Sequence, residues 1–312
     1  MNIIGLDALV FGVEDLAACG QYLIDYGLRD AGHGRFEALD GTAVVIRAQD
    51  DPSLPPAMGT ASLLRETVYG VADEATLQAI ASELSKDRPV TQEGGVVRAQ
   101  DDLGFALAFQ LTVRKTLALP AEAVNAPGAA PQRGPNVLGV SPEIAALPRS
   151  LSHVVYFVPD AAKSEAFYTR LGFVCTDRFT GVGPFLRPAG TRDHHTLFMI
   201  QTPPFMKGCE HFTFHMGGPT ELLLAGTRFV EKGYQSFWGP GRHRFGSNWF
   251  WYFNSPLGCH VEYDADMDLH DEAWAAREAP MGADASQLFL FQHREKWAPS
   301  GPPPGARTGA GH

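Results

Sequence analysis

The chain has 312 residues, of which 45% are hydrophobic and 19% charged, a composition typical of a soluble globular protein with room for two domains. Its net charge of −10, together with the lack of any lysine- or arginine-rich run, makes nucleic acid and anionic membrane surfaces poor candidate partners. Four cysteines without C-x-x-C spacing, no basic leader and no membrane-length apolar run favour a cytoplasmic protein with reduced thiols.

The sequence contains an internal repeat, in which Leu6–Leu28 aligns with Leu151–Phe173. Each segment reads as a short apolar strand, an acidic turn and an amphipathic helix that ends at a glycine. Asp160 is a predicted N-cap of the second helix, and Gly172 is a predicted residue just beyond its end.

Later strands follow the same repeat. Glu66–Val71 lies over His211–Met216, and Leu103–Phe109 pairs with Leu257–Tyr263 once a small length difference is allowed. Neither half contains a long parallel run of strands between helices. The pattern therefore predicts an α+β protein made of two similar sheet-based modules.

Composition suggests where these modules begin and end. The predicted parts are an N-terminal module at 1–116, a Pro/Ala/Gly-rich linker at 117–150, a C-terminal module at 151–270 and a tail at 271–312. Within the tail, residues 271–280 look helical. The last dozen residues are predicted to be disordered.

Histidines cluster in the second half, where eight of the eleven lie between positions 153 and 270. Three residues, His153, His211 and Glu262, occupy matched strand positions there. The first half holds Ala8, Glu66 and Ala108 at the corresponding places, and these cannot hold a metal together. Two imidazoles and one carboxylate on one face suit a divalent iron with open positions, although these ligand types also permit manganese.

Further motifs surround these residues. They are the His194-His195-Thr196-Leu197 run, the strand opening His211-Phe-Thr-Phe, Gly241-Arg242-His243, the segment WFWYFNSPLG, and Glu262 within HVEY. With these features the chain resembles the type I extradiol ring-cleaving dioxygenases of the vicinal oxygen chelate superfamily. The resemblance spans most of the chain. It implies paired βαβββ units in each module and a metal site in the C-terminal module only.

The resemblance also implies roles for individual residues. His153, His211 and Glu262 would ligate Fe(II), with Mn(II) as the other candidate. His195 would be the acid–base residue, since an imidazole titrates near neutrality. His243 and Tyr252 would hydrogen-bond the substrate oxygen and the intermediate formed with O2. The implied enzyme is a homo-oligomer that inserts both atoms of O2 into a catechol, with substituted and biaryl catechols among the candidates.

Neighbouring residues have two interpretations each. His194 is expected to point to the opposite face of a strand from His195 and to be structural, and His215 is either a support for the site or a core histidine. Phe250 shares a face with Tyr252, so it is a candidate contact for the substrate ring. The arginines at positions 187, 192 and 242 are candidates for holding a substrate carboxylate or for a structural role.

Two other functions compete with ring cleavage. One is a different vicinal oxygen chelate metalloenzyme, such as an isomerase, lyase or thiol transferase, which would gather ligands from both modules. The other is a non-catalytic protein that binds an aromatic compound between the modules.

Overall fold

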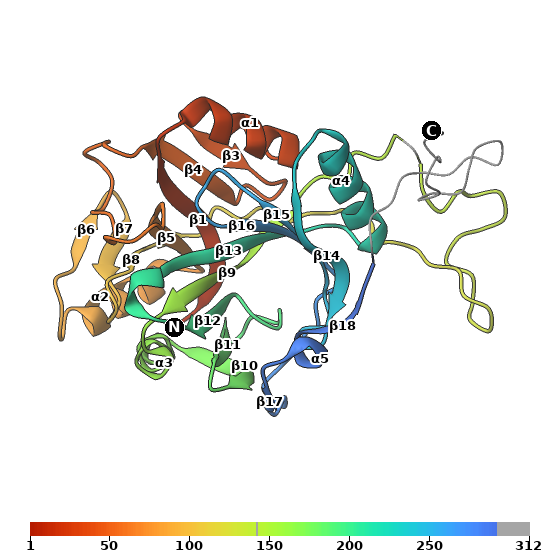
Figure 1. Cartoon of the computed structure of the whole chain (residues 1–312). Coiled ribbons are helices and arrows are strands. Elements are labelled where there is room, and N and C mark those ends of the chain that lie inside the picture. Colours follow the sequence, from red (N-terminus) through yellow and green to blue (C-terminus); the bar gives the residue numbers. More distant parts are fainter. Residues whose placement is uncertain (142, 292–312) are drawn as a thin grey trace, which may run out of the picture.

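A computed structural model of the protein describes residues 1–141 and 143–291, which form two β-sheets lying against each other (Figure 1). The first module contains the strands β1 (Ile3–Val13), β2 (Arg29–Asp30), β3 (Arg35–Glu37), β4 (Ala43–Ala48), β5 (Leu64–Val71), β6 (Thr91–Glu93), β7 (Val96–Gln100) and β8 (Ala106–Leu111), and the helices α1 (Leu16–Tyr26) and α2 (Glu74–Leu84). The second module begins with β9 (Ser150–Val158), α3 (Ala161–Arg170), β10 (Phe173–Thr180), β11 (Gly183–Pro188), β12 (Leu197–Gln201), η1 (Pro204–Met206) and β13 (Gly208–His215). It continues with α4 (Pro219–Glu231), β14 (Ser236–His243), β15 (Trp249–Asn254), β16 (His260–Ala265), β17 (Arg277–Pro280), α5 (Ala283–Ser286) and β18 (Gln287–Leu290).

Both sheets are built from the same unit, a strand and a helix followed by three strands. The first sheet has the order β2-β3-β4-β1-β5-β8-β7-β6. The second has the order β17-β10-β11-β12-β9-β13-β16-β15-β14-β18, so the C-terminal segment adds one strand at each edge. The predicted α+β architecture of two modules with paired βαβββ units is confirmed.

The ends of the repeated helices follow the sequence signals. The side chains of Asp15 and Asp160 accept hydrogen bonds from the first-turn N–H groups of α1 and α3. Gly27 and Gly172 follow these helices with φ of 112° and 88°, a conformation that glycine adopts without strain. These predicted boundaries are confirmed.

The modules pack through their helices as well as their sheets. Helix α1 contacts α4, where Tyr22 lies edge-on to Phe229 with ring centroids 5.1 Å apart. Helix α3 reaches α2 through an ion pair of 3.2 Å between Arg170 and Glu83. Each module is therefore braced by the helices of the other.

The helix predicted at 271–280 is wrong. Residues 277–280 form β17, which pairs in parallel with β10. Trp274 Nε1 donates to the carbonyl of Thr176, and the Arg277 guanidinium binds Asp177. These contacts override the helical preference of an alanine-rich segment. The disorder predicted for residues 301–312 lies outside the described residues.

No helix in the described ranges has the length and apolar character needed to cross a membrane.

We expect Gly226→Ala to destabilise the protein, because a Cβ atom there would lie 2.1 Å from Cε3 of Trp251. Overpacking costs about 1–3 kcal/mol, against a gain of about 1 kcal/mol from alanine in a helix interior. Denaturant unfolding should therefore give a lower free energy of unfolding. Thr227→Ala, at the half-buried next residue of α4, is the control and should change little. Equal stability of Gly226→Ala and wild type would contradict the close packing of α4 on β15.

Candidate metal centre

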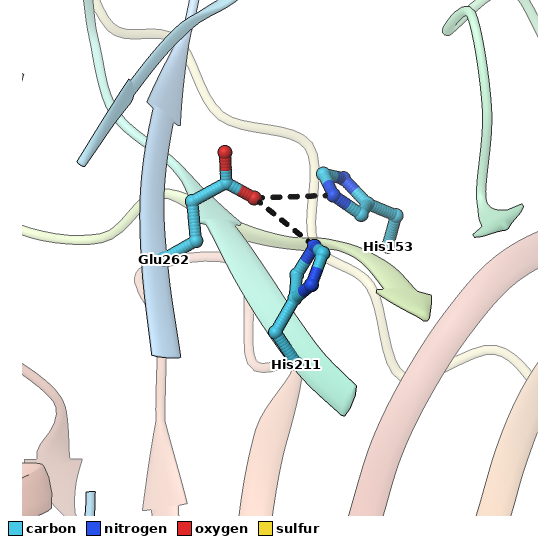
Figure 2. A group of neighbouring side chains, drawn as sticks. All are labelled: His153, His211 and Glu262. Atoms are coloured by element: carbon cyan, nitrogen blue, oxygen red, sulfur yellow. Dashed lines mark ion pairs between the residues drawn. The ribbon is translucent and has the colours of Figure 1, made fainter. Parts of the chain in front are cut away.

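Three adjacent strands place His153, Thr213 and Glu262 in one row. Strand β9 pairs antiparallel with β13, where His153 is opposite Thr213, and β13 pairs in parallel with β16, where Thr213 is opposite Glu262. His211 lies two residues before Thr213 and so on the same face of β13. Figure 2 shows the two imidazoles and the carboxylate converging from these strands.

The donor atoms of this group fit a divalent metal ion. Glu262 Oε2 lies 3.2 Å from His153 Nε2 and 3.4 Å from His211 Nε2. Two ligands at right angles on one ion, with bonds of about 2.1 Å, would be about 3 Å apart. Across the described ranges, the buried atoms His211 Nε2 and Glu262 Oε1 have no hydrogen-bond partner. Buried polar atoms are normally satisfied, so this pair of orphaned atoms supports a metal site.

The other ring nitrogens of the two histidines are held from behind. His153 Nδ1 lies 2.9 Å from Ser152 Oγ, which itself donates to Asp264. His211 Nδ1 bonds to the Glu210 carboxylate. Such partners fix the ring orientation and leave Nε2 as the ligand atom, as around metal-bound histidines in general.

Burial and the neighbouring charges give the two histidines different pKa values. Burial lowers the pKa of His153, with partial opposition from Glu262. Burial also acts to lower the pKa of His211, but Glu210 and Glu262 outweigh it and raise that pKa to about 10. For Glu262, burial acts to raise the pKa, but the adjacent histidines hold it well below its usual range.

The first module lacks such a group at the equivalent place. Its row is Ala8, Val68 and Ala108 in the same strand register, and it belongs to a small apolar cluster. Glu66, which matches His211 in the repeat, pairs with Arg98 at 3.0 Å. The sequence predicted candidate metal ligands in the second module only. The structure agrees, because apolar side chains of the first module fill the position that the ligands occupy in the second.

His195 lies directly beside the triad. Its ring centroid is 4.1 Å from that of His153, and the edge of Phe185 packs against it with centroids 5.0 Å apart. Burial, followed by the neighbouring His153, lowers the pKa of His195 well below its usual value. His195 is therefore a neutral imidazole next to the candidate metal position.

His243 and Tyr252 form a pair on the other side. His243 Nδ1 lies 2.8 Å from the carbonyl of Ser286, so it carries the proton and leaves Nε2 to accept from the Tyr252 hydroxyl at 3.1 Å. Burial, then Glu262, raises the pKa of Tyr252 well above its usual value, which keeps the phenol protonated.

Phe250 is fully buried and stacks on His243, with ring centroids 4.0 Å apart. It supports His243 and does not line the cavity, so its predicted contact with a substrate ring is wrong.

A cavity of about 290 Å³ opens in front of these residues. Its polar lining comes from His153, His195, Glu210, His211, His243, Asn248, Tyr252 and Ser286, and its apolar lining from Val155, Phe157, Phe179, Phe185, Phe198, Ile200, Phe237, Trp238, Phe245 and Met281. No lysine or arginine is among these lining residues.

The three candidate arginines lie elsewhere. None of Arg187, Arg192 and Arg242 lines the cavity. Arg187 is buried and donates to the carbonyls of Thr191 and Asp271, which is a structural role. The idea that one of these arginines holds a substrate carboxylate is therefore not supported by their positions.

The sequence reasoning missed several carboxylates behind the site. Glu210 binds both His211 and His260 and, although burial opposes it, these histidines lower its pKa to about 2. Asp264 holds Ser152 and also His215, whose Nδ1 lies 2.7 Å away, so His215 supports the site from behind. The available signal was alternation, because Glu262 and Asp264 share a face of β16.

His194 is also placed differently from the prediction. The pair His194-His195 lies in the loop before β12, not on a strand, so the two rings do not point to opposite faces. Their Nδ1 atoms are 3.0 Å apart. His194 is fully buried and does not line the cavity.

Comparison with known proteins agrees with this geometry. Residues 150–263 match the model of the Glyoxalase/Bleomycin resistance protein/Dioxygenase superfamily. The C-terminal module is therefore similar to proteins of this superfamily. The whole fold resembles a Mn(II)-bound glyoxalase from Novosphingobium aromaticivorans, with a TM-score of 0.70 and 19% identity over 92% of this chain and 90% of that chain. It also resembles 2,2',3-trihydroxybiphenyl 1,2-dioxygenase from dibenzofuran-degrading Sphingomonas wittichii strain RW1, with a TM-score of 0.67 and 19% identity over 93% and 99% of the two chains.

A curated relative matches part of the sequence. Metapyrocatechase 2 from Cupriavidus necator is 33% identical over 186 residues, which is 59% of this chain and 53% of that protein. The match thus spans about half the length of the relative. The predicted resemblance to extradiol dioxygenases is confirmed.

We expect Mn(II) binding at pH 7 to release about one proton per site, since a histidine must be neutral to ligate a metal. His211, with a pKa raised to about 10, holds a proton that the metal must displace, whereas the lowered pKa of His153 leaves it neutral. Affinity should therefore increase as pH rises from 6 to 8. Calorimetry in buffers of different ionisation enthalpy measures the released protons. Glu210→Gln is the matched variant and should release fewer protons, because Glu210 helps to raise the pKa of His211. Metal affinity of the wild type that does not change with pH would contradict the prediction.

Proposed function

We propose that this protein is an Fe(II)-dependent extradiol dioxygenase that inserts both atoms of O2 and cleaves the ring of a catechol beside its hydroxyl groups. The observation that carries the proposal is the two-histidine, one-carboxylate group with His195 and the His243–Tyr252 pair around it. All of these residues except the fully buried Glu262 line one cavity. The names of metapyrocatechase 2 and of the trihydroxybiphenyl dioxygenase, which describe those proteins, support it.

The metal ligands proposed are His153, His211 and Glu262. Two imidazoles and one carboxylate that leave positions open are the ligand set of non-haem Fe(II) oxygenases, and Mn(II) is compatible with the same donors. When bound, Fe(II) supplies a Lewis acid for the catechol hydroxyl groups and a redox centre through which the ring reduces O2.

The chain's own residues bind, orient and move protons. Neutral His195 is an acceptor for a substrate hydroxyl proton. The Tyr252 hydroxyl, kept protonated by burial, is a donor for a substrate oxygen and brings no additional charge. The aromatic side chains Phe179, Phe185 and Phe198 pack together on one side of the cavity and exclude water from the reacting atoms.

The cavity also favours one class of catechol. Its walls are mostly aromatic and aliphatic, and the carboxylate among its lining residues is Glu210. An anionic substituent would enter without a cationic partner, which is costly in an apolar site. We therefore propose an uncharged catechol with an apolar substituent, such as an aryl or alkyl group.

A metal shared between modules, as expected for an isomerase, lyase or thiol transferase, is not supported. The equivalent row of the first module, Ala8, Val68 and Ala108, has no ligand atoms in its side chains.

Ring cleavage is tested by loading the protein with Fe(II) without air, then adding O2 and 2,3-dihydroxybiphenyl. We expect O2 uptake equal to catechol consumed and a yellow ring-fission product. Glu262→Ala should abolish metal binding and turnover together, because it removes the carboxylate ligand. Its control is Glu66→Ala in the first module, which should keep both. Uptake of O2 without ring opening, for every catechol tried, would refute the proposal.

His195→Phe should keep the metal and lose turnover, since it removes the proton acceptor while retaining a ring. Loss of an acid–base residue lowers kcat by roughly 10²–10⁴-fold. Metal content and single-turnover kinetics measure the two effects separately. An unchanged kcat would remove His195 from the reaction.

Substrate class is tested by comparing kcat/KM for 2,3-dihydroxybiphenyl, catechol and 2,3-dihydroxybenzoate. We expect the carboxylated compound to be poorer than catechol by on the order of 100-fold, as an unpaired buried charge costs several kcal/mol. Equal kcat/KM for catechol and the carboxylate would contradict the proposed class while leaving ring cleavage intact.

A further inference from the structure

A buried chain of polar groups stands behind His195. His194 Nδ1 lies 3.0 Å from His195 Nδ1, and His194 Nε2 lies 2.8 Å from Asp177 Oδ2. Both His194 and Asp177 are completely buried, and neither lines the cavity. Their side-chain hydrogen bonds reach the cavity through His195.

Asp177 is held as an ion by the C-terminal segment. Its Oδ1 accepts the backbone N–H of Arg277 at 2.8 Å, and its Oδ2 accepts from the Arg277 guanidinium at 2.5 Å. Trp274 and Phe245 each face that guanidinium, 4.9 Å from their ring centroids. Burial acts to raise the pKa of Asp177, but His194 and Arg277 outweigh it and lower the pKa. An ionised carboxylate can only accept hydrogen bonds.

This acceptor determines which ring nitrogens carry protons. Burial lowers the pKa of His194, opposed in part by Asp177, so its ring is neutral and has one N–H. That N–H must be on Nε2, facing Asp177, which leaves Nδ1 as an acceptor. His195 must then donate from its own Nδ1. The lone pair of neutral His195 is left on Nε2.

We propose that Asp177 and His194 are positioning residues that set the tautomer of His195, so that its unprotonated Nε2 is available to the cavity as the base. The inference rests on the proposed function, in which that nitrogen takes a proton from a substrate hydroxyl. The O–H bond of the hydroxyl breaks, an N–H bond forms at Nε2, and the electron pair stays on the substrate oxygen. With the opposite tautomer, His195 would present an N–H and could not accept this proton.

Packing already fixes the ring plane of His195, between His153 and the edge of Phe185. The chain behind it is therefore not needed to hold the ring in place. The chain of His194 and Asp177 instead determines which of the two neutral tautomers His195 adopts. Strand β17 contributes to this effect because its residue Arg277 holds Asp177 in the ionised form.

Asp177→Asn tests the proposal. The amide oxygen should remain at the backbone N–H of Arg277, so the NH2 group takes the place of Oδ2 and donates to His194 Nε2. His194 would then donate from Nδ1, and His195 would carry its proton on Nε2. Nitrogen-15 NMR of the histidine rings in the metal-free protein distinguishes protonated from unprotonated nitrogens. We expect His195 to show a protonated Nδ1 and an unprotonated Nε2 in the wild type, and the reverse in the variant.

Turnover of the Fe(II)-loaded Asp177→Asn protein should decrease in kcat, with KM for 2,3-dihydroxybiphenyl within a few-fold of wild type. The same change in a catalytic triad, where it imposes the wrong tautomer, lowers kcat by roughly 10⁴-fold. Glu165→Gln is the control, because Glu165 binds Arg178, the neighbour of Asp177 on β10, and does not touch His194. It should leave both the tautomer and kcat unchanged.

A second pair of variants serves if Asp177→Asn does not fold. His194→Gln offers a donor to Asp177 and an acceptor to His195, so it should preserve the tautomer and most of kcat. His194→Leu offers neither and should lose both. Equal behaviour of the two variants, or an unchanged His195 tautomer in Asp177→Asn, would overturn the proposal. NMR detects the tautomer without turnover. Absence of ring cleavage in the wild type would therefore refute the proposed function, while the tautomer of His195 could still be tested.

Discussion

The buried carboxylate of Glu262 is the constraint on which the site depends. A carboxylate removed from water must be matched by donors or cations, or it becomes protonated. Here the Thr213 hydroxyl donates to it and two imidazoles stand 3.2 and 3.4 Å from one of its oxygens, while the other oxygen has no hydrogen-bond partner among the described residues. A divalent cation would satisfy this arrangement more completely than the protein alone. The surrounding carboxylates, Glu210 and Asp264, then orient the histidines for that cation.

The first module supports this site without contributing a ligand. Tyr26, at the end of α1, stacks on Tyr263 of β16 with ring centroids 4.0 Å apart. Its hydroxyl donates to the backbone carbonyl of Glu262 at 2.5 Å, and the Tyr263 hydroxyl donates in return to the Tyr26 carbonyl at 2.6 Å. The strand that carries the carboxylate is thereby fixed from its far side. The first module therefore contributes rigidity to the site, while the candidate metal ligands all come from the second module.

Periodicity made part of the site predictable. The repeat places His153, His211 and Glu262 on one face of adjacent strands, and the register of β9, β13 and β16 brings them together as the alternation indicated. His195 and the His243–Tyr252 pair were reached through the family resemblance, and they lie around the same cavity.

Contacts that depend on tertiary structure were not predictable in this way. The loop before β12 turns His194 toward His195, although strand alternation would separate them, and Asp177 reaches His194 from another strand. The alanine-rich segment before Arg277 favours a helix locally, yet its side chains bind β10 and it becomes a strand. Phe250 was correctly predicted to share a strand face with Tyr252. Its ring, however, stacks on His243 and does not line the cavity.

The account depends on one metal ion held by the second module alone. Diffraction from crystals of the Fe(II)-loaded protein, measured on both sides of the iron absorption edge, locates that ion directly. One anomalous peak per chain, within bonding distance of His153 Nε2, His211 Nε2 and a Glu262 oxygen, is the predicted result. A peak shared with residues of the first module, or none at the triad of a protein that contains iron, would contradict it.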